Sequence, residues 1–317
     1  MIDRLVTVGE GLGVFRTDSP DGLRRAPDVA VSTGGAEGNV AMAVARLGLP
    51  AVWLGRVGAD GLGERVAREL RAEGVEVHAI VDPGHPTGLL VKQISSAGRT
   101  DVGYYRSLSA GSTLCAADVE LLELTARTLV HVTGITAGLS STAHEAIDRL
   151  LERADEAECT VSFDVNHRSR LWSTRSASTV YQHIARRADI VFSSVDEVDL
   201  LLPGWHGEGA TAAEAADALA ANGHHHVVVT DGARGSAARI DGTTTLGSAV
   251  PVTVVDTVGA GDAFVGGYLV ALSRGDDVGE RLSLASQLGA AACRHAGDWE
   301  GVAGWSLDET GREPVRR

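Results

Sequence analysis

The chain has 317 residues, of which 44% are hydrophobic and 22% are charged, and its formal net charge is −14. This length and composition predict one large α/β domain, or one domain with a small appendage, and exclude a disordered chain. The acidic balance disfavours a nucleic-acid-binding protein, which normally carries a basic surface, so no nucleic-acid partner is expected.

The cysteines and the N-terminus indicate the compartment. Cys115, Cys159 and Cys293 are scattered and form no Cys-x-x-Cys pair. This pattern favours free thiols in a reducing environment over a disulfide scaffold or a zinc cluster. The first twenty residues lack the basic and apolar regions of a signal peptide, and no apolar run approaches the ~20 residues of a membrane span. We therefore expect a cytoplasmic protein with no membrane partner.

The first part of the chain alternates between strands and helices, with one irregular stretch. Hydrophobic spacing predicts strands over residues 4–8, 51–54 and 75–81, and helices over 38–47 and from about 62 to 74. Residues 11–33 are rich in Gly, Pro, Asp and Ser and contain short β-prone pieces, so no helix is expected there.

Residues 87–106 interrupt the alternation a second time. The β-rich segments 89–94 and 102–105 surround a Ser-Ala-Gly turn at 96–98, which predicts a hairpin. We expect this hairpin and residues 11–33 to form a small separate sheet, a lid over the site.

Strands and helices alternate again from about residue 115. The predicted strands are 128–132, 159–165, 189–192 and 226–230, and the predicted helices are 140–156, 176–187, 211–221, 260–274 and 279–294. A last strand is expected over 252–255, before Asp256. Alternating elements imply a mostly parallel sheet that helices cover on both faces. The expectation is therefore one domain over 1–317, with a lid formed by about 11–33 and 87–106.

A short segment near the C-terminus carries the strongest functional signal. Residues 256–262 read Asp-Thr-Val-Gly-Ala-Gly-Asp and lead into the helix expected from residue 260. Backbone N–H groups at a helix N-terminus lack intrahelical partners and lie at the positive end of the helix dipole, so this turn is suited to phosphate. Gly259 and Gly261 permit close approach to the backbone. Asp262 adds a proton acceptor beside the cradle, as phosphoryl transfer requires. An ordinary βα turn is the structural alternative.

A second glycine element lies near the N-terminus. Gly34-Gly35 precedes the helix expected over 38–47, and Asn39 within that helix can offer a donor and an acceptor to sugar hydroxyls. Taken alone, this element is also explained as a turn at a helix start with Asn as the cap.

Together, the two elements give the chain a recognisable family pattern. A Gly-Gly-x-x-x-Asn-x-Ala element followed far downstream by Asp-Thr-x-Gly-Ala-Gly-Asp-x-Phe resembles the ribokinase-like (PfkB) carbohydrate kinases, from Val6 to about Gly301. The resemblance implies a three-layer α/β/α sandwich with a β-sheet lid, and ATP and Mg²⁺ as cofactors. It also implies that Asp262 takes the proton from the accepting hydroxyl, while Gly259, Ala260 and Gly261 form the anion hole. Because a helix dipole favours an ionised carboxylate, we expect Asp262 to be a weak base.

Two further segments indicate the acceptor. Tyr104-Tyr105-Arg106 ends the proposed lid, and Asp164-Val165-Asn166-His167-Arg168 follows a predicted strand. Two arginines on distant segments suit a carboxylate, because guanidinium binds it bidentately, although either arginine alone is more commonly a surface ion-pair partner.

These segments are similar to those of the 2-keto-3-deoxygluconate kinases, a sub-group of the same family. The similarity implies phosphorylation of that sugar acid at its terminal hydroxyl. The residues that it places at the acceptor are Glu10, Gly34, Gly35, Asn39, Leu90, Tyr104, Arg106, Ile135, Asp164, Asn166 and Arg168. Leu90 stands where the sub-group can carry a tyrosine, which leaves open the choice between gluconate-type and galactonate-type acids.

The nucleotide and metal residues follow from the same resemblance. Many relatives carry an Asn-x-x-Glu element, which here reads Ser194-Val195-Asp196-Glu197, so Ser194 is expected near ATP and Glu197 near Mg²⁺ through water. A helix cap with acids in its first turn explains this spacing equally well. Asp231, Gly232 and Gly235 are also expected near ATP, together with Gly259 and Gly261, and the alternative for this segment is a hairpin turn into residues 236–240.

Other classes fit less well. A nearer alternative is a neutral-sugar kinase such as a fructokinase, which has no need of the arginine pair. A nicotinamide-dependent oxidoreductase is disfavoured because the third glycine of Gly-x-Gly-x-x-Gly is out of place in Gly9-Glu10-Gly11-Leu12-Gly13, and turn residues through Pro20 and Gly22 replace the helix that this motif needs. A P-loop NTPase is excluded because the sequence has no GxxxxGK[ST] motif. A catalytically silent binding protein on the same fold remains a third class. We also expect a homo-oligomer through the lid, whose edges a symmetric partner could cover.

Overall fold

The structure is a computed structural model that describes residues 1–302 except for 18, 20, 95–99 and 173. Its central sheet has the strand order β13-β12-β11-β10-β9-β8-β1-β4-β5. Neighbouring strands from β11 to β5 are parallel, and β12 and β13 extend the sheet antiparallel. The bounds are β1 (Arg4–Val8), β4 (Ala51–Gly58), β5 (Glu76–Asp82), β8 (Thr128–Thr133), β9 (Thr160–Asp164), β10 (Ile190–Ser194), β11 (His226–Thr230), β12 (Ser236–Ile240) and β13 (Thr243–Gly247).

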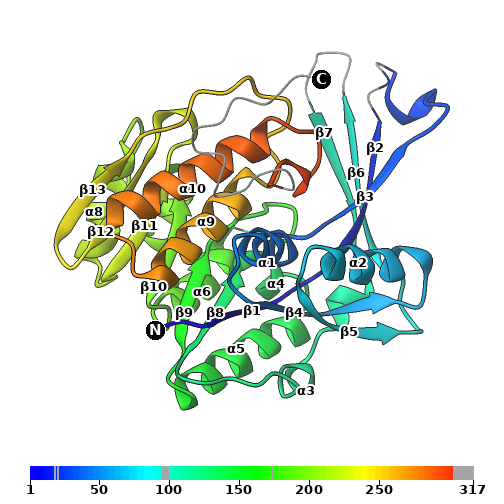
Figure 1. The fold of residues 1–317 in the computed structure, drawn as a ribbon, viewed down its shortest axis with the longest axis horizontal. Helices are drawn as coiled ribbons and strands as arrows, with labels where there is room; N and C mark the ends of the chain where they lie inside the picture. The colour runs from blue at the N-terminus through cyan, green and yellow to red at the C-terminus, as the bar shows by residue number, and fades with distance from the viewer. Residues whose placement is uncertain (18, 20, 95–99, 173, 303–317) are drawn as a thin grey trace.

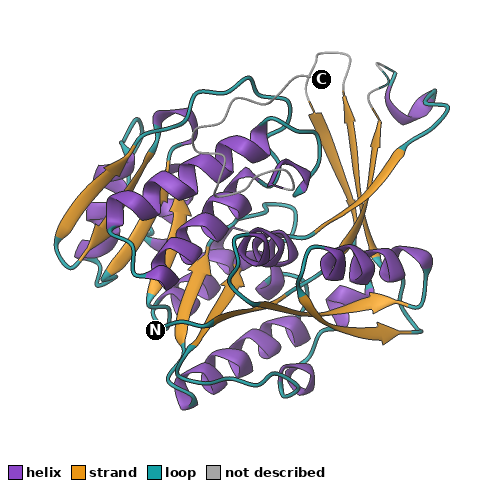
Figure 2. Ribbon diagram, viewed as in Figure 1, coloured by secondary structure: helices purple, strands orange, loops and turns teal. Residues whose placement is uncertain are grey.

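Helices cover both faces of this sheet, and Figure 2 shows the strands between the two helical layers. One layer consists of α1 (Ala36–Arg46), α2 (Gly61–Ala72), α9 (Ala260–Arg274) and α10 (Val278–Cys293). The other consists of α3 (Ala116–Val119), α4 (Gly134–Ala137), α5 (Ser141–Glu156), α6 (Thr174–Ala185), α7 (Val198–Leu201) and α8 (Ala212–Ala221). Short 3₁₀ turns complete the elements: η1 (Gly22–Arg24), η2 (Ala110–Thr113), η3 (Val195–Glu197), η4 (Gly232–Arg234) and η5 (Glu300–Val302).

The central strands are apolar on both faces, as a sheet buried between two layers requires. In β1, Leu5 belongs to the core under α1 and α9, whereas Val6 belongs to the core under α5 and α6. The predicted α/β/α sandwich with a mostly parallel sheet is therefore confirmed.

Glycines bring α9 close to its neighbouring helices. A Cβ on Gly266 would lie 2.8 Å from the Cβ of Ala43 in α1, and a Cβ on Gly267 would lie 3.0 Å from the Cα of Ala285 in α10. Because only hydrogen occupies these positions, α9 packs closely against both α1 and α10. The first turn of α9 therefore lies beside the first turn of α1.

A small sheet projects from one side of the molecule, beside α2 (Figure 1). Its order is β3-β2-β6-β7, with bounds β2 (Leu12–Thr17), β3 (Ala30–Gly34), β6 (Gly88–Ile94) and β7 (Thr100–Tyr105). The antiparallel pairing of β6 with β7 confirms the predicted hairpin, while its turn at 96–98 lies outside the described residues. The parallel pairing of β2 with β6 joins two segments that are far apart in the sequence. We call this element the small sheet.

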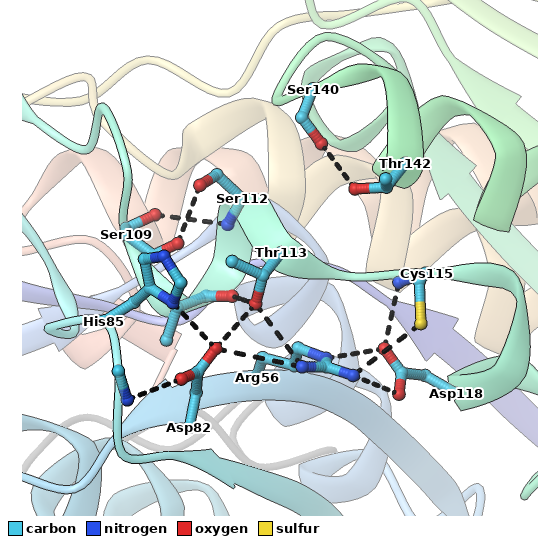
Figure 3. Close-up of polar contacts among 12 residues, drawn as sticks. Arg56, Asp82, His85, Ser109, Ser112, Thr113, Cys115, Asp118, Ser140 and Thr142 are labelled. Carbon is cyan, nitrogen blue, oxygen red and sulfur yellow. Dashed lines mark hydrogen bonds and ion pairs between the residues drawn. The ribbon is translucent and has the colours of Figure 1, made fainter.

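A polar network joins the two segments that flank the β6–β7 hairpin in the sequence, at the points where they leave the central sheet and return to it (Figure 3). Arg56 on β4 donates to both carboxylate oxygens of Asp118, at 2.7 and 2.9 Å. Asp82, at the end of β5, accepts hydrogen bonds from the Thr113 hydroxyl at 2.9 Å and the Gly84 N–H at 2.8 Å, and it also lies 3.1 Å from His85 Nδ1. These contacts hold both ends of the hairpin against the edge of the central sheet.

The strand expected over 252–255 is wrong. The chain there forms no strand, the side chains of Val254 and Val255 are 57% and 59% exposed, and the Val255 N–H donates to the carbonyl of Cys293. The β12–β13 hairpin ends one side of the sheet, and β13 was not predicted. The backbone of residues 255 and 256 donates to the end of α10 instead of to a strand, so tertiary contacts override the β propensity of the valines. Helix α9 therefore follows a loop.

Candidate active site

The carboxyl ends of the parallel strands meet at one edge of the central sheet, where open α/β sheets bind ligands. Asp164 ends β9, Ser194 ends β10 and Thr230 ends β11, and all three line a cavity of about 400 Å³. The start of α9 and the small sheet complete its walls. The lining residues are Leu90, Val102, Tyr104, Asp164, Asn166, Arg168, Phe192, Ser193, Ser194, Glu197, Thr230, Thr257, Val258, Gly259, Gly261, Asp262, Phe264 and Val265.

Asp262 is held between two amide side chains in the first turn of α9. Asn39 Nδ2 donates to one carboxylate oxygen at 2.7 Å, and Asn166 Nδ2 donates to the other at 3.1 Å. Asp262 is buried, and this desolvation raises its pKa above the ordinary value, although Asn39, Arg168, Asn166 and Lys92 oppose the shift. The expectation of a weak base is therefore wrong, because burial outweighs the helix dipole and the donated hydrogen bonds.

Asn39 reaches the site from α1. Its Nδ2 donates to Asp262, and its buried Oδ1 has no hydrogen-bond partner among the described residues. The Asn39 side chain therefore orients the carboxylate directly and leaves one acceptor unused. Gly35, which precedes α1, has φ 137°, and a Cβ there would lie 2.2 Å from the carbonyl oxygen of Glu10. This turn thus needs glycine.

The glycines of the 256–262 segment differ in what they require. Gly259 has φ 79°, and a Cβ on it would lie 1.7 Å from the carbonyl oxygen of Asp298. A Cβ on Gly261 would meet nothing within 4 Å. Gly259 therefore lets another backbone segment pack against the turn, and both Gly259 and Gly261 line the cavity. Ala260 begins α9 and does not line the cavity.

The loop after β9 brings charge to the cavity. Asp164 is buried, and its pKa lies well above the ordinary value because of desolvation first and then the nearby carboxylates of Glu197 and Asp262. Asn166 adopts a left-handed conformation with φ 38°, which turns the chain so that its side chain meets Asp262. Arg168 lines the cavity and donates to the carbonyl of His167 at 3.1 Å.

Arg106 does not line the cavity beside Arg168. Its Nε donates to Glu10 Oε2 at 2.7 Å, and Glu10 also accepts from the hydroxyl of Ser109. The Arg106 guanidinium lies 5.4 Å from the ring centre of Tyr104, which does line the cavity. Arg106 is thus paired with Glu10, and its contact with the cavity is indirect, because it packs on Tyr104 and Tyr104 lines the cavity.

The residues expected near the nucleotide fall into two groups. Ser194 and Glu197 line the cavity, where Glu197 accepts from the backbone N–H groups of Ser194 at 2.9 Å and His167 at 2.6 Å. Asp231, Gly232 and Gly235 lie outside the lining.

The outer group makes its own contacts. Asp231 forms a bidentate pair with Arg234, both distances being 2.7 Å. A Cβ on Gly235 would lie 2.4 Å from the carbonyl oxygen of Gly247, so this glycine serves the hairpin of β12 and β13.

Sequence reasoning missed Glu37 in the first turn of α1. It is 1% exposed, and its Oε1 accepts from the hydroxyls of Thr133 at 2.6 Å and Thr136 at 2.5 Å. The two threonines flank the turn that carries Ile135, which is buried in α4. A glutamate near a helix start is typical of an exposed residue, so no local signal marks this one as buried. Lys92, Asp256 and Asp298 also form a buried cluster that the sequence does not reveal.

In the part of the chain that the structure describes, no helix has the length and apolarity that a membrane crossing requires. The same residues contain no group of three or more His, Cys, Asp or Glu side chains placed to hold a metal ion.

Comparison with known proteins places this geometry in a family. The sequence pattern of the pfkB family carbohydrate kinases matches residues 3–302. A 2-dehydro-3-deoxygalactonokinase of Haloferax volcanii is 34% identical, covering 88% of this chain and 87% of the relative, and a 2-dehydro-3-deoxygluconokinase of Bacillus subtilis is 32% identical, covering 94% and 91%. A ribokinase II-type protein of E. coli, solved in complex with ATP and Mg²⁺, superposes with a TM-score of 0.84 at 25% identity and covers 95% of this chain and 96% of its own. The paired glycine elements, the sandwich and these similarities agree, and the chain belongs to the pfkB family of carbohydrate kinases.

Proposed function

We propose that this carbohydrate kinase transfers the terminal phosphoryl group of ATP to the terminal hydroxyl of 2-keto-3-deoxygluconate, giving 2-keto-3-deoxy-6-phosphogluconate and ADP. The observation that carries the proposal is the guanidinium of Arg168 in a cavity that also holds the carboxylates of Asp164, Glu197 and Asp262. A cation kept in such an acidic cavity is suited to the carboxylate of an acid substrate. The similarity to kinases named for keto-deoxy sugar acids supports the same assignment.

In this proposal, Asp262 accepts the proton of the acceptor hydroxyl. The hydroxyl oxygen forms a bond to the terminal phosphorus as the bond from phosphorus to the ADP oxygen breaks, and the proton passes to the carboxylate. The raised pKa makes Asp262 a better proton acceptor, and Asn39 and Asn166 fix its two oxygens. At the positive end of α9, Gly259 and Gly261 line the cavity and would bind the transferred group, whereas the Ala260 N–H donates to the carbonyl of Thr257 at 3.3 Å and would join them only by releasing that hydrogen bond.

We assign the acceptor side of the cavity to Leu90, Tyr104 and Arg168, together with Asp164 and Asn166 at the end of β9. Arg106 acts on this side through the Tyr104 ring that it covers, and Glu10 holds Arg106 in place. Gly34, Gly35 and Ile135 shape the backbone around the same pocket.

We assign the nucleotide side to the ends of β10 and β11, where Ser194 and Thr230 line the cavity. Asp231, Gly232 and Gly235 continue this edge. Burial first, and then the nearby carboxylates of Glu197 and Asp262, raise the pKa of Asp164, and a cation bound beside these oxygens would lower the cost of ionising them. Mg²⁺, which neutralises phosphate charge in phosphoryl transfer, suits these oxygen donors, and Glu197 would contact it through water.

Two alternatives remain. A neutral-sugar kinase such as a fructokinase would use the same Asp262 but would not depend on Arg168. A catalytically silent binding protein would bind ATP and the sugar acid without forming ADP. The cytoplasmic location stays a prediction from composition.

A substrate panel tests the proposal. We expect ADP release to be fastest with 2-keto-3-deoxygluconate or its galactonate epimer, because Arg168 can pair with their carboxylate, and slower with gluconate, fructose, ribose or adenosine. Highest kcat/KM on fructose or on a nucleoside would refute the sugar-acid assignment, and absence of ADP release with every acceptor would favour the silent binding protein.

Replacing Asp262 tests the proton acceptor. Asp262→Asn should lower kcat at least about a hundredfold, as expected for loss of a positioned base. Its melting temperature should not fall much, because burial already disfavours the charged carboxylate. Asp148→Asn, at a half-buried aspartate of α5 that contacts His144 and His183 and does not line the cavity, serves as the matched control and should keep full turnover. A kcat within threefold of wild type for Asp262→Asn would contradict the assignment.

Replacing Arg168 tests recognition of the acid. Arg168→Ala should raise the KM for the sugar acid by about 10- to 100-fold, the loss expected for a charge-assisted hydrogen bond of ~1.5–3 kcal/mol, with a smaller effect on kcat. Arg170→Ala is the control, because Arg170 belongs to the same loop but donates to the Val102 carbonyl. An unchanged KM in Arg168→Ala would rule out its role.

We also propose a homo-oligomer that forms through the small sheet. Tyr105 on β7 and Leu108 just after it are 68% and 75% exposed, and the outer edges of β3 and β7 are open in the single chain. Sedimentation should show a dimer or larger assembly at micromolar concentration, and Tyr105→Lys should shift it toward the monomer. A monomeric wild-type chain would refute the proposal.

A further inference from the structure

A fully buried lysine links the small sheet to the body of the molecule. Lys92 on β6 is 1% exposed, and its Nζ lies 2.5 Å from Asp298 Oδ1 and 3.1 Å from Asp256 Oδ2. Burying an ammonium group is costly unless its partners are well placed, and loss of one partner leaves a buried charge without compensation. The position of Lys92 is therefore tied to the positions of both carboxylates.

The two carboxylates lie on either side of the turn that precedes α9. Asp256 Oδ1 accepts from the N–H of Val258 at 3.1 Å, so this side chain fixes the backbone directly before Gly259. The carbonyl oxygen of Asp298 packs against Gly259 from the other side, 1.7 Å from the position that a Cβ would take.

Asp298 also contacts the first glycine element. Its Oδ2 lies 2.5 Å from where a Cβ of Gly34 would be, and the neighbouring Trp299 donates from its indole N–H to the carbonyl of Thr33 at 3.1 Å. Gly34 and Thr33 belong to β3 of the small sheet. One buried residue thus touches both glycine elements, and Lys92 holds that residue.

We propose that Lys92 is a positioning residue for phosphoryl transfer, which holds Asp256 and Asp298 so that the Gly259–Gly261 amides keep their place beside the cavity. This inference rests on the proposed role of those amides. Through Lys92, the small sheet is connected to the turn that receives the transferred group, although the ammonium itself does not line the cavity.

The charge state of Asp298 supports this dependence. Burial raises its pKa to about 6, and the charge of Lys92 and its hydrogen bond to Asp298 oppose that rise. Removal of the ammonium takes away the group that keeps this carboxylate ionised, and with it the ion pair that fixes the 297–299 segment against Gly259.

The test compares Lys92→Ala with wild type under saturating sugar acid and ATP. We expect kcat to fall at least about tenfold, because a displaced amide cradle loses transition-state stabilisation, while the KM for ATP changes less than about threefold. Methylammonium chloride should restore kcat at least threefold by occupying the vacated position. Tetramethylammonium chloride at the same ionic strength is too large and should not.

Two further variants keep the test decisive if Lys92→Ala does not fold. Asp256→Asn retains the Lys92–Asp298 pair and should lower kcat severalfold with unchanged KM for ATP. Arg153→Met removes a partly buried contact between α5 and the carbonyls of Val119 and Leu122, none of which lines the cavity, and should lower the melting temperature without lowering kcat.

A folded Lys92→Ala with kcat within twofold of wild type would overturn the proposal, and so would equal recovery with both ammonium salts. If Lys92→Ala does not fold, unchanged kcat in Asp256→Asn would overturn it. Failure of the Asp262 assignment is seen separately, as full turnover in Asp262→Asn, and does not depend on these results.

Discussion

The site depends on one buried carboxylate that two amides hold from opposite sides. Asn39 comes from the first helix of the chain and Asn166 from the loop after β9, and each donates to a different oxygen of Asp262. The first hydrogen bond needs α1 packed against α9, which the missing side chain at Gly266 permits, and the second needs the loop after β9 to reach α9. The fold therefore fixes the orientation of the Asp262 carboxylate through both of its oxygens.

Concentrating acids in this cavity has a thermodynamic consequence. The pKa values of Asp164 and Asp262, which line the cavity, and of Glu37, which lies outside its lining, are all raised, chiefly by burial. A group whose folded pKa is raised stabilises the fold most below its unfolded pKa, and this contribution is lost as the pH rises through the folded pKa. At neutral pH the free enzyme thus has a stability lower than its packing alone would give, and a bound cation would offset part of that loss.

Local patterns predicted the sandwich, the β6–β7 pairing and the first turn of α9, because each depends on periodicity or on backbone freedom within a few residues. They failed where distant parts of the chain decide. Residues 252–255 have strand propensity, yet the N–H of Val255 donates to the carbonyl of Cys293 at the end of α10 and the segment forms no strand. The basicity of Asp262 was predicted from the helix dipole, but burial reverses it.

The roles of charged residues were harder still to predict from the sequence. Arg106 and Arg168 share a residue type and a proposed role, but Glu10 takes one of them out of the cavity. Lys92 has the local sequence of an exposed lysine on a strand, and only the approach of Asp256 and Asp298 from the other end of the chain makes it a buried ion. Spacing cannot reveal partners that lie 164 and 206 residues away.

The central place of β1 in the sheet has a consequence for synthesis of the protein. As the chain leaves the ribosome, β1 can pair with β4 early, but its other edge stays open until β8, beginning at Thr128, has emerged. The apolar face of helix α1 stays uncovered for longer, because α9, which packs against it, begins only at Ala260. Apolar surface on the first fifty residues therefore remains uncovered through most of translation, and this is the interval in which a nascent chain is most exposed to aggregation and most in need of a chaperone.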